Sequence, residues 1–391
     1  RVPAAAARRL SAVARSNEPS GASAPTGSPG PVGSDAKARP RRRRRWAFVL
    51  AALMVGTIVA LVLVELAFRA FWTLPPWFAE FQQAGMYAAA ADGAPALRPG
   101  YRGTLRVGDA YAPDLRINAR GVRGPEIGAR RPGEERVLMV GDSLVFGYGV
   151  EDEHALPARV EAELAARGVV ATVGNGGVPG YGSRHYVEHL RRLDERFGAD
   201  LLVCCGFLGN DAVDDTVPNR TVYAGLMLQE PMASLVFTSW RARLALRSRA
   251  ALWVEAWILE HRPSWSPLAT WSPDPETMTR AVGLPPETPQ NQRHAGLFLD
   301  VRDERHTWQP GAEPVLPRLL GYLRASLQRA ADTAGRRPLV FVILPTKWQV
   351  DESLRTARLR ELGLDPKDYE RGLAPARWRA VGEGPGLPTL D

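Results

Sequence analysis

The chain has 391 residues and a net charge of +8, a length that allows one or two sizeable hydrophobic cores. Residues 1–45 carry eleven Lys or Arg and two Asp or Glu, a net +9, so the remaining residues sum to −1. The basic charge therefore belongs to the N-terminal tail, and the rest of the chain has no excess that would indicate nucleic acid as a partner.

The tail is followed by a long apolar segment. Residues 1–45 are rich in Ala, Pro, Gly and Ser and end in Arg41–Arg45. Such a tail buries too little apolar surface to offset its ordering entropy, so we predict that it is disordered. The next nineteen residues, 46–64 (WAFVLAALMVGTIVALVLV), contain no charge. As a helix they match the roughly 30 Å of a bilayer core, which predicts a transmembrane helix over residues 46–68.

The residues that flank this segment predict its orientation. Arg41–Arg45 favour a cytoplasmic N-terminus, and Trp46, Phe71 and Trp72 occupy positions typical of interfacial aromatics. We therefore expect a single-pass membrane protein with its folded part outside the cytoplasm. A cleaved signal peptide is the alternative, but the apolar run exceeds the usual ~7 to 15 residues and no small-residue cleavage site follows promptly. Nucleic-acid binding by the arginine run would require the tail to act alone.

Beyond the apolar segment, two regions differ in pattern. Residues 69–134 have many Gly, Pro and Arg and no sustained periodicity, which predicts a stem and lead-in. From Arg136 onward, apolar runs alternate with helical patterns. Strands are predicted at 136–140, 169–173, 201–207 and 338–344, with helices around 156–164, 183–197 and 319–327. Apolar strands that alternate with helices are typical of a parallel sheet covered on both faces, so we predict a three-layer α/β/α sandwich.

Cysteine and histidine provide little further chemistry. Cys204 and Cys205 are adjacent in an apolar strand. Because neighbours in a strand point to opposite faces, we predict that they pack separately and do not pair with each other. His185 and His189 are predicted to lie on the surface of the helix at 183–197.

Polar, glycine-rich stretches follow three of the predicted strands. They are Gly141-Asp142-Ser143, residues 174–182 (GNGGVPGYG) and residues 206–215 (GFLGNDAVDD). The carboxyl ends of parallel strands meet at one edge of a sheet, so these stretches are expected to converge. A serine hydroxyl, backbone amides made accessible by glycine and an asparagine side chain are the groups that acyl transfer requires.

At these stretches the sequence resembles the SGNH (GDSL-type) hydrolases. Residues 141–149 (GDSLVFGYG) are similar to the first block of that family, with Ser143 in the nucleophile position. Residues 175–182 (NGGVPGYG) and 209–211 (GND) are similar to the second and third blocks, whose oxyanion residues correspond to Gly180 and Asn210. The resemblance implies a flavodoxin-like fold, an oxyanion hole formed by Ser143, Gly180 and Asn210, and no metal or organic cofactor.

The resemblance covers about residues 115–391. It includes the lead-in INARGVRG at 117–124 and ILPTKWQV at 343–350, which are similar to stretches in membrane-anchored and cell-envelope members. We predict a hydrolase-like domain over 135–391, with an insertion at about 216–315 whose fold the sequence does not indicate.

One part of the family pattern has no match in this chain. The family takes its general base from an Asp-x-x-His block after the final strand, whereas no histidine follows His306. Asp303 and His306 have the spacing, but they precede the strand at 338–344. Asp391 corresponds to the residue that opens the final strand region, so the expectation is that the chain is truncated and its base lies beyond residue 391.

Each candidate residue also has a purely structural interpretation. Ser143 can cap the helix that follows it, Gly180 can serve a turn, and Asn210 can tolerate an unusual loop conformation. Asp214 and Asp215 are predicted to be solvated, because no His or Glu lies at metal-ligand spacing. The chain lacks a Gly-x-Ser-x-Gly elbow and a P-loop, and Pro179 replaces the third glycine of a dinucleotide fingerprint.

The sequence therefore predicts a membrane-anchored serine esterase. Ser143 would form an acyl-enzyme with an acylated envelope carbohydrate or lipid. The alternatives are an O-acetyltransferase of the same fold, in which a sugar hydroxyl replaces water, and a non-catalytic scaffold that lacks the base.

Overall fold

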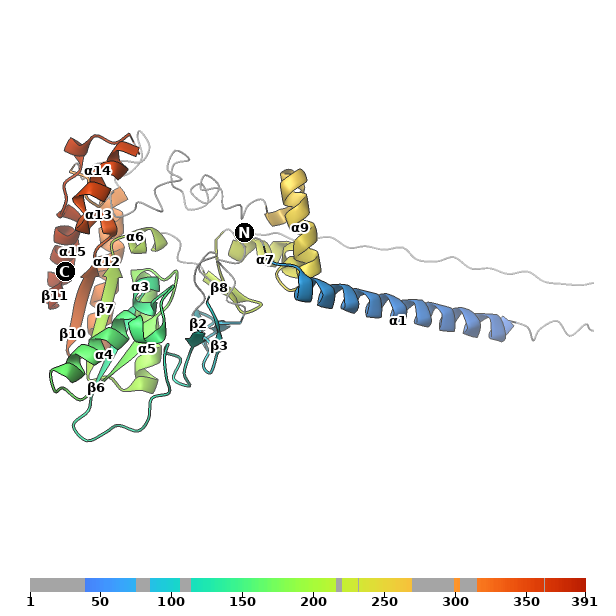
Figure 1. Ribbon diagram of the computed structural model, residues 1–391, viewed down its shortest axis with the longest axis horizontal. Helices are drawn as coiled ribbons and strands as arrows, with labels where there is room; N and C mark the ends of the chain where they lie inside the picture. The colour runs from blue at the N-terminus through green and yellow to red at the C-terminus, as the bar shows by residue number, and fades with distance from the viewer. Residues whose placement is uncertain are drawn as a thin grey trace, which may run out of the picture. The chain divides into compact units, whose positions relative to one another are not determined.

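The computed structural model describes residues 39–74, 85–105, 114–215, 220–230, 232–268, 299–302, 315–361 and 363–391. Contacts divide the chain into two units, Arg1–Val62 and Leu63–Asp391, whose helices and strands are labelled in Figure 1. The tail up to residue 38, for which the sequence predicts disorder, lies outside the described residues, as does much of the predicted insertion.

A long N-terminal helix, α1, covers Arg39–Phe71. Its stretch Arg44–Phe71 is long and apolar enough to cross a membrane, and no other helix of the described residues is. Apolar side chains from Trp46 to Leu66 are exposed along it, as expected of side chains that face lipid rather than a protein core. The helix extends beyond the predicted span of 46–68 at both ends, where its side chains become charged or aromatic.

The second unit is built around a five-stranded parallel sheet in the order β11-β10-β7-β5-β6. Its strands are β5 (Glu135–Gly141), β6 (Ala171–Gly177), β7 (Leu201–Phe207), β10 (Leu339–Leu344) and β11 (Thr389–Leu390). If these five strands are numbered 1 to 5 in chain order, their order across the sheet is 2-1-3-4-5. The direction in which successive strands are added to the sheet therefore reverses between β5 and β7. Ligand crevices form outside the carboxyl ends of the strands at such a reversal.

Helices cover the sheet on both faces and give the predicted α/β/α sandwich. One cluster of buried side chains joins α5 (Ser183–Phe197), α12 (Val315–Ala334) and α15 (Leu373–Glu383) to one face. A second cluster joins α4 (Leu156–Ala166) to the other. Cys204 belongs to the first cluster and Cys205 to the second, and both are free thiols. The prediction that they pack on opposite faces is confirmed.

Strand β6 differs from its predicted position. It begins two residues later than expected and takes in Gly174, Gly176 and Gly177, which the sequence assigns to a loop. A Cβ on Gly177 would lie 2.1 Å from the backbone nitrogen of Phe146, and a Cβ on Gly174 would meet the Phe197 ring. These glycines are therefore strand residues that allow close packing, not turn residues.

The predicted stem contains structure of its own. It forms two antiparallel pairs, β1 (Tyr87–Ala89) with β2 (Pro95–Leu97) and β3 (Arg102–Thr104) with β4 (Asp114–Arg116). Leu97, Leu115 and Val122 from this region are buried in the same cluster as the sheet. Residues 85–105 and 114–122 thus contribute to the folded core. The strands are too short to produce the periodicity that would predict them.

The described part of the predicted insertion is a hairpin followed by helices. β8 (Arg220–Tyr223) pairs with β9 (Leu226–Gln229), and α7 (Met232–Thr238), α8 (Trp240–Ala245), α9 (Arg249–His261) and the 3-10 turn η2 (Pro263–Trp265) follow. These elements share a separate apolar cluster that includes Leu228, Met232 and Leu252.

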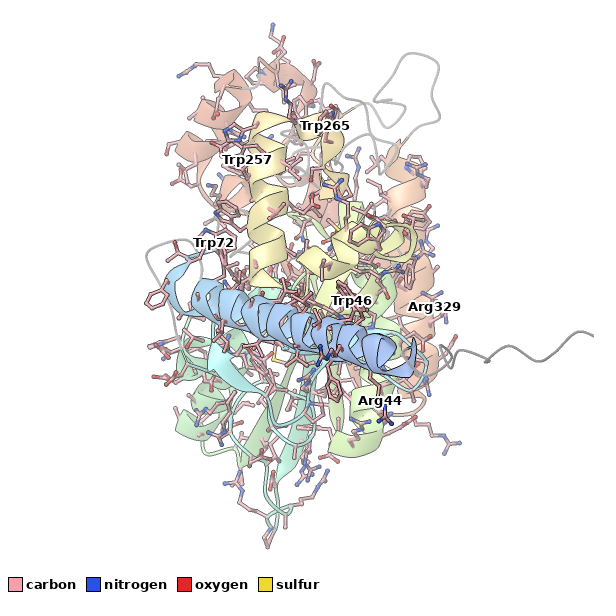
Figure 2. The ribbon with its side chains drawn as sticks, turned by 90° about the vertical axis from the view of Figure 1, so that its right-hand side faces the viewer. Arg44, Trp46, Trp72, Trp257, Trp265 and Arg329 are labelled. Atoms are coloured by element: carbon pink, nitrogen blue, oxygen red, sulfur yellow. The ribbon has the colours of Figure 1, made fainter. Side chains whose placement is uncertain are left out.

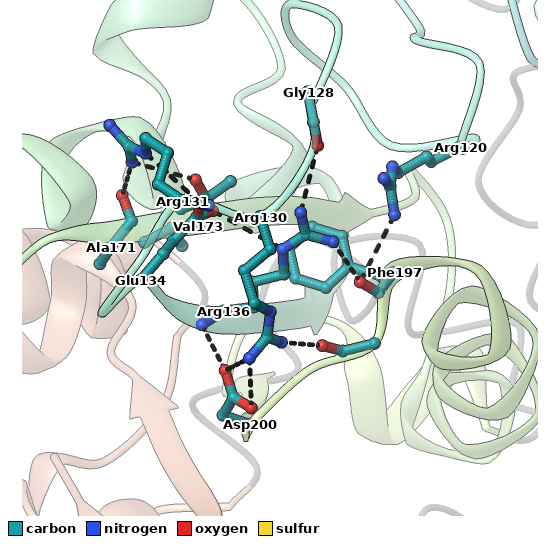
Figure 3. Close-up of polar contacts among 12 residues, drawn as sticks. Arg120, Gly128, Arg130, Arg131, Glu134, Arg136, Ala171, Val173, Phe197 and Asp200 are labelled. Atoms are coloured by element: carbon teal, nitrogen blue, oxygen red, sulfur yellow. Dashed lines mark hydrogen bonds and ion pairs between the residues drawn. The ribbon is translucent and has the colours of Figure 1, made fainter.

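Ion pairs and hydrogen bonds fasten the amino ends of the strands (Figure 3). Arg136, at the start of β5, donates to the carbonyls of Phe197 at 3.0 Å and Gly128 at 3.1 Å. Its backbone N–H donates to Asp200, which also accepts from Arg130. The backbone N–H of Arg131, followed by other donors to the carboxylate, lowers the pKa of Glu134 to about 2. At this edge the carboxylates of Glu134 and Asp200 are each bound by arginine side chains and backbone N–H groups.

Candidate active site

Ser143 is the first residue of a single-turn helix, α3 (Ser143–Phe146), directly after β5. Asp142 caps this helix, because its Oδ1 accepts from the Leu144 N–H at 2.8 Å. The Ser143 hydroxyl donates to Oδ2 of the same aspartate at 3.3 Å. The capping interpretation of Ser143 is therefore wrong, and Asp142 performs that role.

Arg123, from the lead-in INARGVRG, fixes the turn that follows Ser143. Its guanidinium is buried and donates to the carbonyls of Phe146 at 2.8 Å and Val150 at 2.6 Å. It also pairs with Asp152 at 2.9 Å. The guanidinium of Arg123 has five N–H donors and can bind all of these acceptors at once. The lead-in therefore holds the turn that carries Ser143 in place.

Ser143 and Asn210 line one pocket of about 720 Å³. They follow β5 and β7, the two neighbouring strands at which the winding reverses. The pocket is lined by Ser143, Leu144, Phe207, Gly209, Asn210, Pro345, Thr346, Lys347, Trp348 and Arg358. The expected convergence of the first and third polar stretches is thus observed.

Gly180 lies outside this set of lining residues. Its φ of +79° favours glycine, and an added Cβ would lie 3.1 Å from Gln229 Nε2 and 3.2 Å from Met227 Cε. The Gln229 amide also donates to the Gly180 carbonyl at 3.5 Å. The second polar stretch therefore contacts the β8–β9 hairpin, and the structure does not bring Gly180 to the wall shared by Ser143 and Asn210.

Asn210 is held by a chain of polar contacts. Its Nδ2 donates to Asp214 at 2.6 Å, and Asp214 pairs with buried Arg220 at 3.2 Å. The guanidinium of Arg220 in turn contacts the ring of His185. The oxygen of the Asn210 amide is buried without a hydrogen-bond partner among the described residues. The donor end of this amide is fixed by the carboxylate, which sets the rotamer of a residue in the pocket wall.

Buried carboxylates lie beneath the pocket. Burial is the main cause that raises the pKa of Asp142 and Asp214 to about 6 and that of Asp215 to about 7. Burial also raises the pKa of Asp211, which accepts from the Tyr186 hydroxyl and the Phe207 N–H. The prediction that Asp214 and Asp215 are solvated is wrong. Asp215 is covered because it accepts from the Ser183 hydroxyl and the Arg184 N–H.

The opposite wall comes from β10 and the helices after it. Thr346, Lys347 and Trp348 belong to ILPTKWQV, and α13 covers Lys347–Val350. Lys347 Nζ lies 4.3 Å from the centroid of the Trp348 ring. Arg358 comes from α14 (Glu352–Glu361) and contacts the same ring at 5.9 Å. Sequence reasoning singled out the loop but missed Arg358, because nothing local relates α14 to the serine turn.

No histidine among the described residues lines the pocket. His189 is buried beneath Tyr181, where desolvation lowers its pKa to about 3, and His185 is half-buried against Arg220. Both were expected on the helix surface, and burial on α5 contradicts that expectation. Asp303 and His306 lie outside the described residues. Asp391 directly follows β11 and pairs with Arg379.

Comparisons with known proteins add a likeness to solved structures. No family model and no curated protein matches the chain. Among solved structures the chain is similar to AlinE4, an SGNH-hydrolase family esterase, with 11% sequence identity and a TM-score of 0.29, over 66% of this chain and 75% of AlinE4. At a similarity this low, the fold assignment depends on the strand order of this chain itself.

Proposed function

We propose that this protein is a membrane-anchored serine esterase or acyl hydrolase. The observation that carries the proposal is that Ser143 and Asn210, which lie far apart in the chain, line the same pocket at the point where the sheet reverses. A nucleophile and an amide donor at such a crevice are the two groups that an acyl transfer needs first. The apolar helix α1 supports anchoring, and the proposed location of the second unit outside the cytoplasm rests on Arg41–Arg45, which precede the apolar run.

The proposed reaction proceeds through a serine ester. Ser143 Oγ attacks the acyl carbonyl carbon, and the charge that develops on the carbonyl oxygen is stabilised by the Ser143 amide and the Asn210 side chain. The carbon–oxygen bond to the alcohol then breaks, and the alcohol leaves with the proton that Ser143 gave up. Water next attacks the serine ester, so that its hydroxyl leaves with the acyl group as the carboxylic acid and its other proton returns to Ser143 Oγ. The proton from Ser143 goes to a general base, which we assign to no residue of this chain.

Two features of the pocket favour a polar acyl ester as substrate. Its volume of about 720 Å³ exceeds what a short acyl group needs, and sites of several hundred Å³ hold drug-sized ligands. Trp348, with Lys347 and Arg358 beside it, offers apolar contact and positive charge on one wall. We therefore propose O-acylated envelope carbohydrate or lipid as the substrate class.

Labelling with a fluorophosphonate probe tests the nucleophile. The full-length protein should be labelled, and Ser143→Ala should abolish labelling. Ser353→Ala removes an exposed serine at α14, so it should leave labelling unchanged and serves as the matched control. Equal labelling of the Ser143→Ala variant would eliminate Ser143 as nucleophile. Absence of labelling in every variant would favour the scaffold alternative.

Product analysis then separates hydrolysis from acyl transfer. Water and a sugar hydroxyl attack the same serine ester, so the probe cannot distinguish them. Incubation with an acetyl ester donor, with and without a soluble oligosaccharide, measures free acetate against acetylated sugar. We expect free acetate to predominate. Acetylated sugar as the main product would support the O-acetyltransferase alternative.

A further inference from the structure

The α7–α9 region exposes large aromatic side chains on its surface. We call Phe237, Trp240, Trp253, Trp257 and Trp265 the aromatic face. Phe237 and Trp265 are each 69% exposed and Trp240 is 66% exposed, although the same helices bury an apolar cluster on their inner side. Figure 2 labels Trp257 and Trp265, with α9 on the face turned toward the viewer. Exposed aromatic side chains grouped in one region mark an interaction surface.

The aromatic face is joined to the end of α1. Residues 63–71 of α1 belong to the same unit as α9. Glu65 accepts from the Ser248 hydroxyl at 2.7 Å and from the Arg249 N–H at 3.0 Å, so it satisfies amides at the N-terminus of α9. Phe68 lies 5.5 Å from Trp253 between ring centroids. α9 therefore starts beside the last turns of the apolar helix.

The position of Glu65 in the sequence locates this contact. Glu65 is the first charged residue after the uncharged run 46–64, so a bilayer that α1 spans ends near Glu65. Trp72 and Leu74, which follow α1, pack against the apolar cluster of α7–α9. The aromatic face is thus attached to the chain where the hydrocarbon region gives way to headgroups.

Charge and residue type agree with that depth. Tryptophan concentrates at membrane interfaces, where its ring is apolar and its N–H remains hydrated. Arg243, Arg247 and Arg262, in α8 and in the turns at the two ends of α9, are exposed, as is Glu260 in α9. The three arginines outnumber this carboxylate and would lie among lipid phosphates. Arginine and tryptophan together on surface helices are typical of segments that lie in the interface.

We propose that the aromatic face is a second membrane contact, which lies in the headgroup region of the same bilayer that α1 spans and binds phospholipid. The inference depends on α1 as a membrane span but not on the esterase proposal. It assigns a role to the predicted insertion: the insertion holds the folded unit against the membrane surface through tryptophan side chains, in addition to the covalent tether.

Lipid-dependent quenching of a single fluorophore tests this contact. Trp257→Cys and Trp265→Cys variants of the full-length protein are labelled with an NBD maleimide and placed in nanodiscs of phosphatidylcholine and phosphatidylglycerol that contain spin-labelled lipid. Cys204 and Cys205 are buried, and burial raises the pKa of the Cys204 thiol to about 12, so the introduced thiol reacts first. Val350→Cys, at a 65% exposed position of α13, is the matched control.

We expect quenching at positions 257 and 265 to be at least about threefold stronger than at position 350. Val55→Cys within α1 reports the span itself. Quenching at 55 with none at 257 and 265 would overturn the inference and leave the span intact. Absence of quenching at 55 would overturn both. Labels at 257 and 265 that are immobilised but not quenched would assign the aromatic face to a protein partner, which also overturns the inference.

Native tryptophan fluorescence provides a test without cysteine or label. Brominated phosphatidylcholine should quench the full-length protein, and a Trp257→Phe/Trp265→Phe variant should lose part of that quenching. Trp378→Phe alters a tryptophan that is 1% exposed in the core, so it should leave the absolute emission lost to the brominated lipid unchanged. A double variant that is quenched as fully as the parent protein would contradict the contact.

Discussion

The carboxylates at the two ends of the central sheet have pKa shifts of opposite direction. At the amino ends of the strands, Glu134 and Asp200 accept from arginines and backbone amides, and these donors lower both pKa values. At the carboxyl ends, burial raises the pKa of Asp142, Asp214 and Asp215. Hydrogen-bond donors thus stabilise the ionised carboxylates at the amino ends of the strands, whereas burial destabilises the ionised carboxylates beside the pocket. Perturbed carboxylates in a cleft are typical of functional sites.

Removal of the serine hydroxyl should have the largest effect on activity. Ser143→Ala is expected to reduce hydrolysis of p-nitrophenyl acetate by the full-length protein by on the order of 10⁴-fold. The melting temperature should not change, because Asp142 and not Ser143 caps α3. Activity within about tenfold of the parent protein would place the reaction elsewhere.

Loss of the amide donor should have the next largest effect. Asn210→Ala removes a side chain from the pocket wall and should lower kcat by about 10² to 10³, the cost of one oxyanion donor. Asn210→Asp keeps the shape but replaces the donor with a carboxylate beside Asp214, so its kcat should be at least as low. A change in KM with unaltered kcat would show that Asn210 contributes binding and not transition-state stabilisation.

At the amino edge, substitution should alter stability without affecting chemistry. Arg136→Ala leaves the buried carbonyl of Phe197 without this donor and removes the ion pair between Arg136 and Glu134. We expect a loss of about 2 to 3 kcal/mol in the free energy of unfolding, measured by denaturant titration in detergent. Activity per folded molecule should be unchanged. Equal losses of activity in Arg136→Ala and Asn210→Ala would erase the distinction between the two edges.

The pH dependence of stability should separate the edges by sign. Asp142, Asp214 and Asp215 hold protons in the folded state that the unfolded chain has released, so stability falls as pH rises from about 4 to about 7. Glu134 has a lowered pKa, so its contribution is lost as pH falls through about 4.5 toward about 2. The melting temperature of the full-length protein should therefore be highest between about pH 4 and pH 5.

A single carboxylate tests this pH profile with the smallest expected effect. Asp215→Asn keeps an oxygen that accepts from the Arg184 N–H but cannot ionise. The fall in melting temperature between about pH 6 and pH 7 should become shallower, equivalent to about 1 kcal/mol. Asp365→Asn, at an exposed cap, is the matched control and should leave the slope unchanged. A steeper slope in Asp215→Asn would contradict burial as the cause.

Several features of this protein could be predicted from short stretches of sequence. Uncharged residues 46–64 match one bilayer thickness, and the apolar runs that became β5, β7 and β10 have the length of buried strands. The C-terminal end of helix α5 was predicted from Gly198, which follows the helix in a left-handed conformation, whereas its N-cap is Gly182 and not Ser183. Ser143 and Asn210 were selected because parallel strands deliver their carboxyl ends to one edge.

Other features depend on contacts between distant segments. Gly174 and Gly177 form part of a strand because Phe197 and Phe146 approach their backbones. The short-strand segments 85–105 and 114–116 pack into the main core, and the helices of the insertion form a separate cluster. Neither arrangement has a local periodic signal, so sequence reasoning identified a stem and an insertion of unassigned fold.

The sequence by itself determined the apolar span, the parallel sheet and the residues that end its strands, since helix length, strand period and glycine punctuation are local properties. Tertiary structure alone decided that Arg358 shares a pocket with Ser143, that Arg123 fixes the serine turn, and that the carboxylates around Asn210 are buried. Burial and long-range pairing depend on which segments the fold brings together, and no short stretch of chain carries that information.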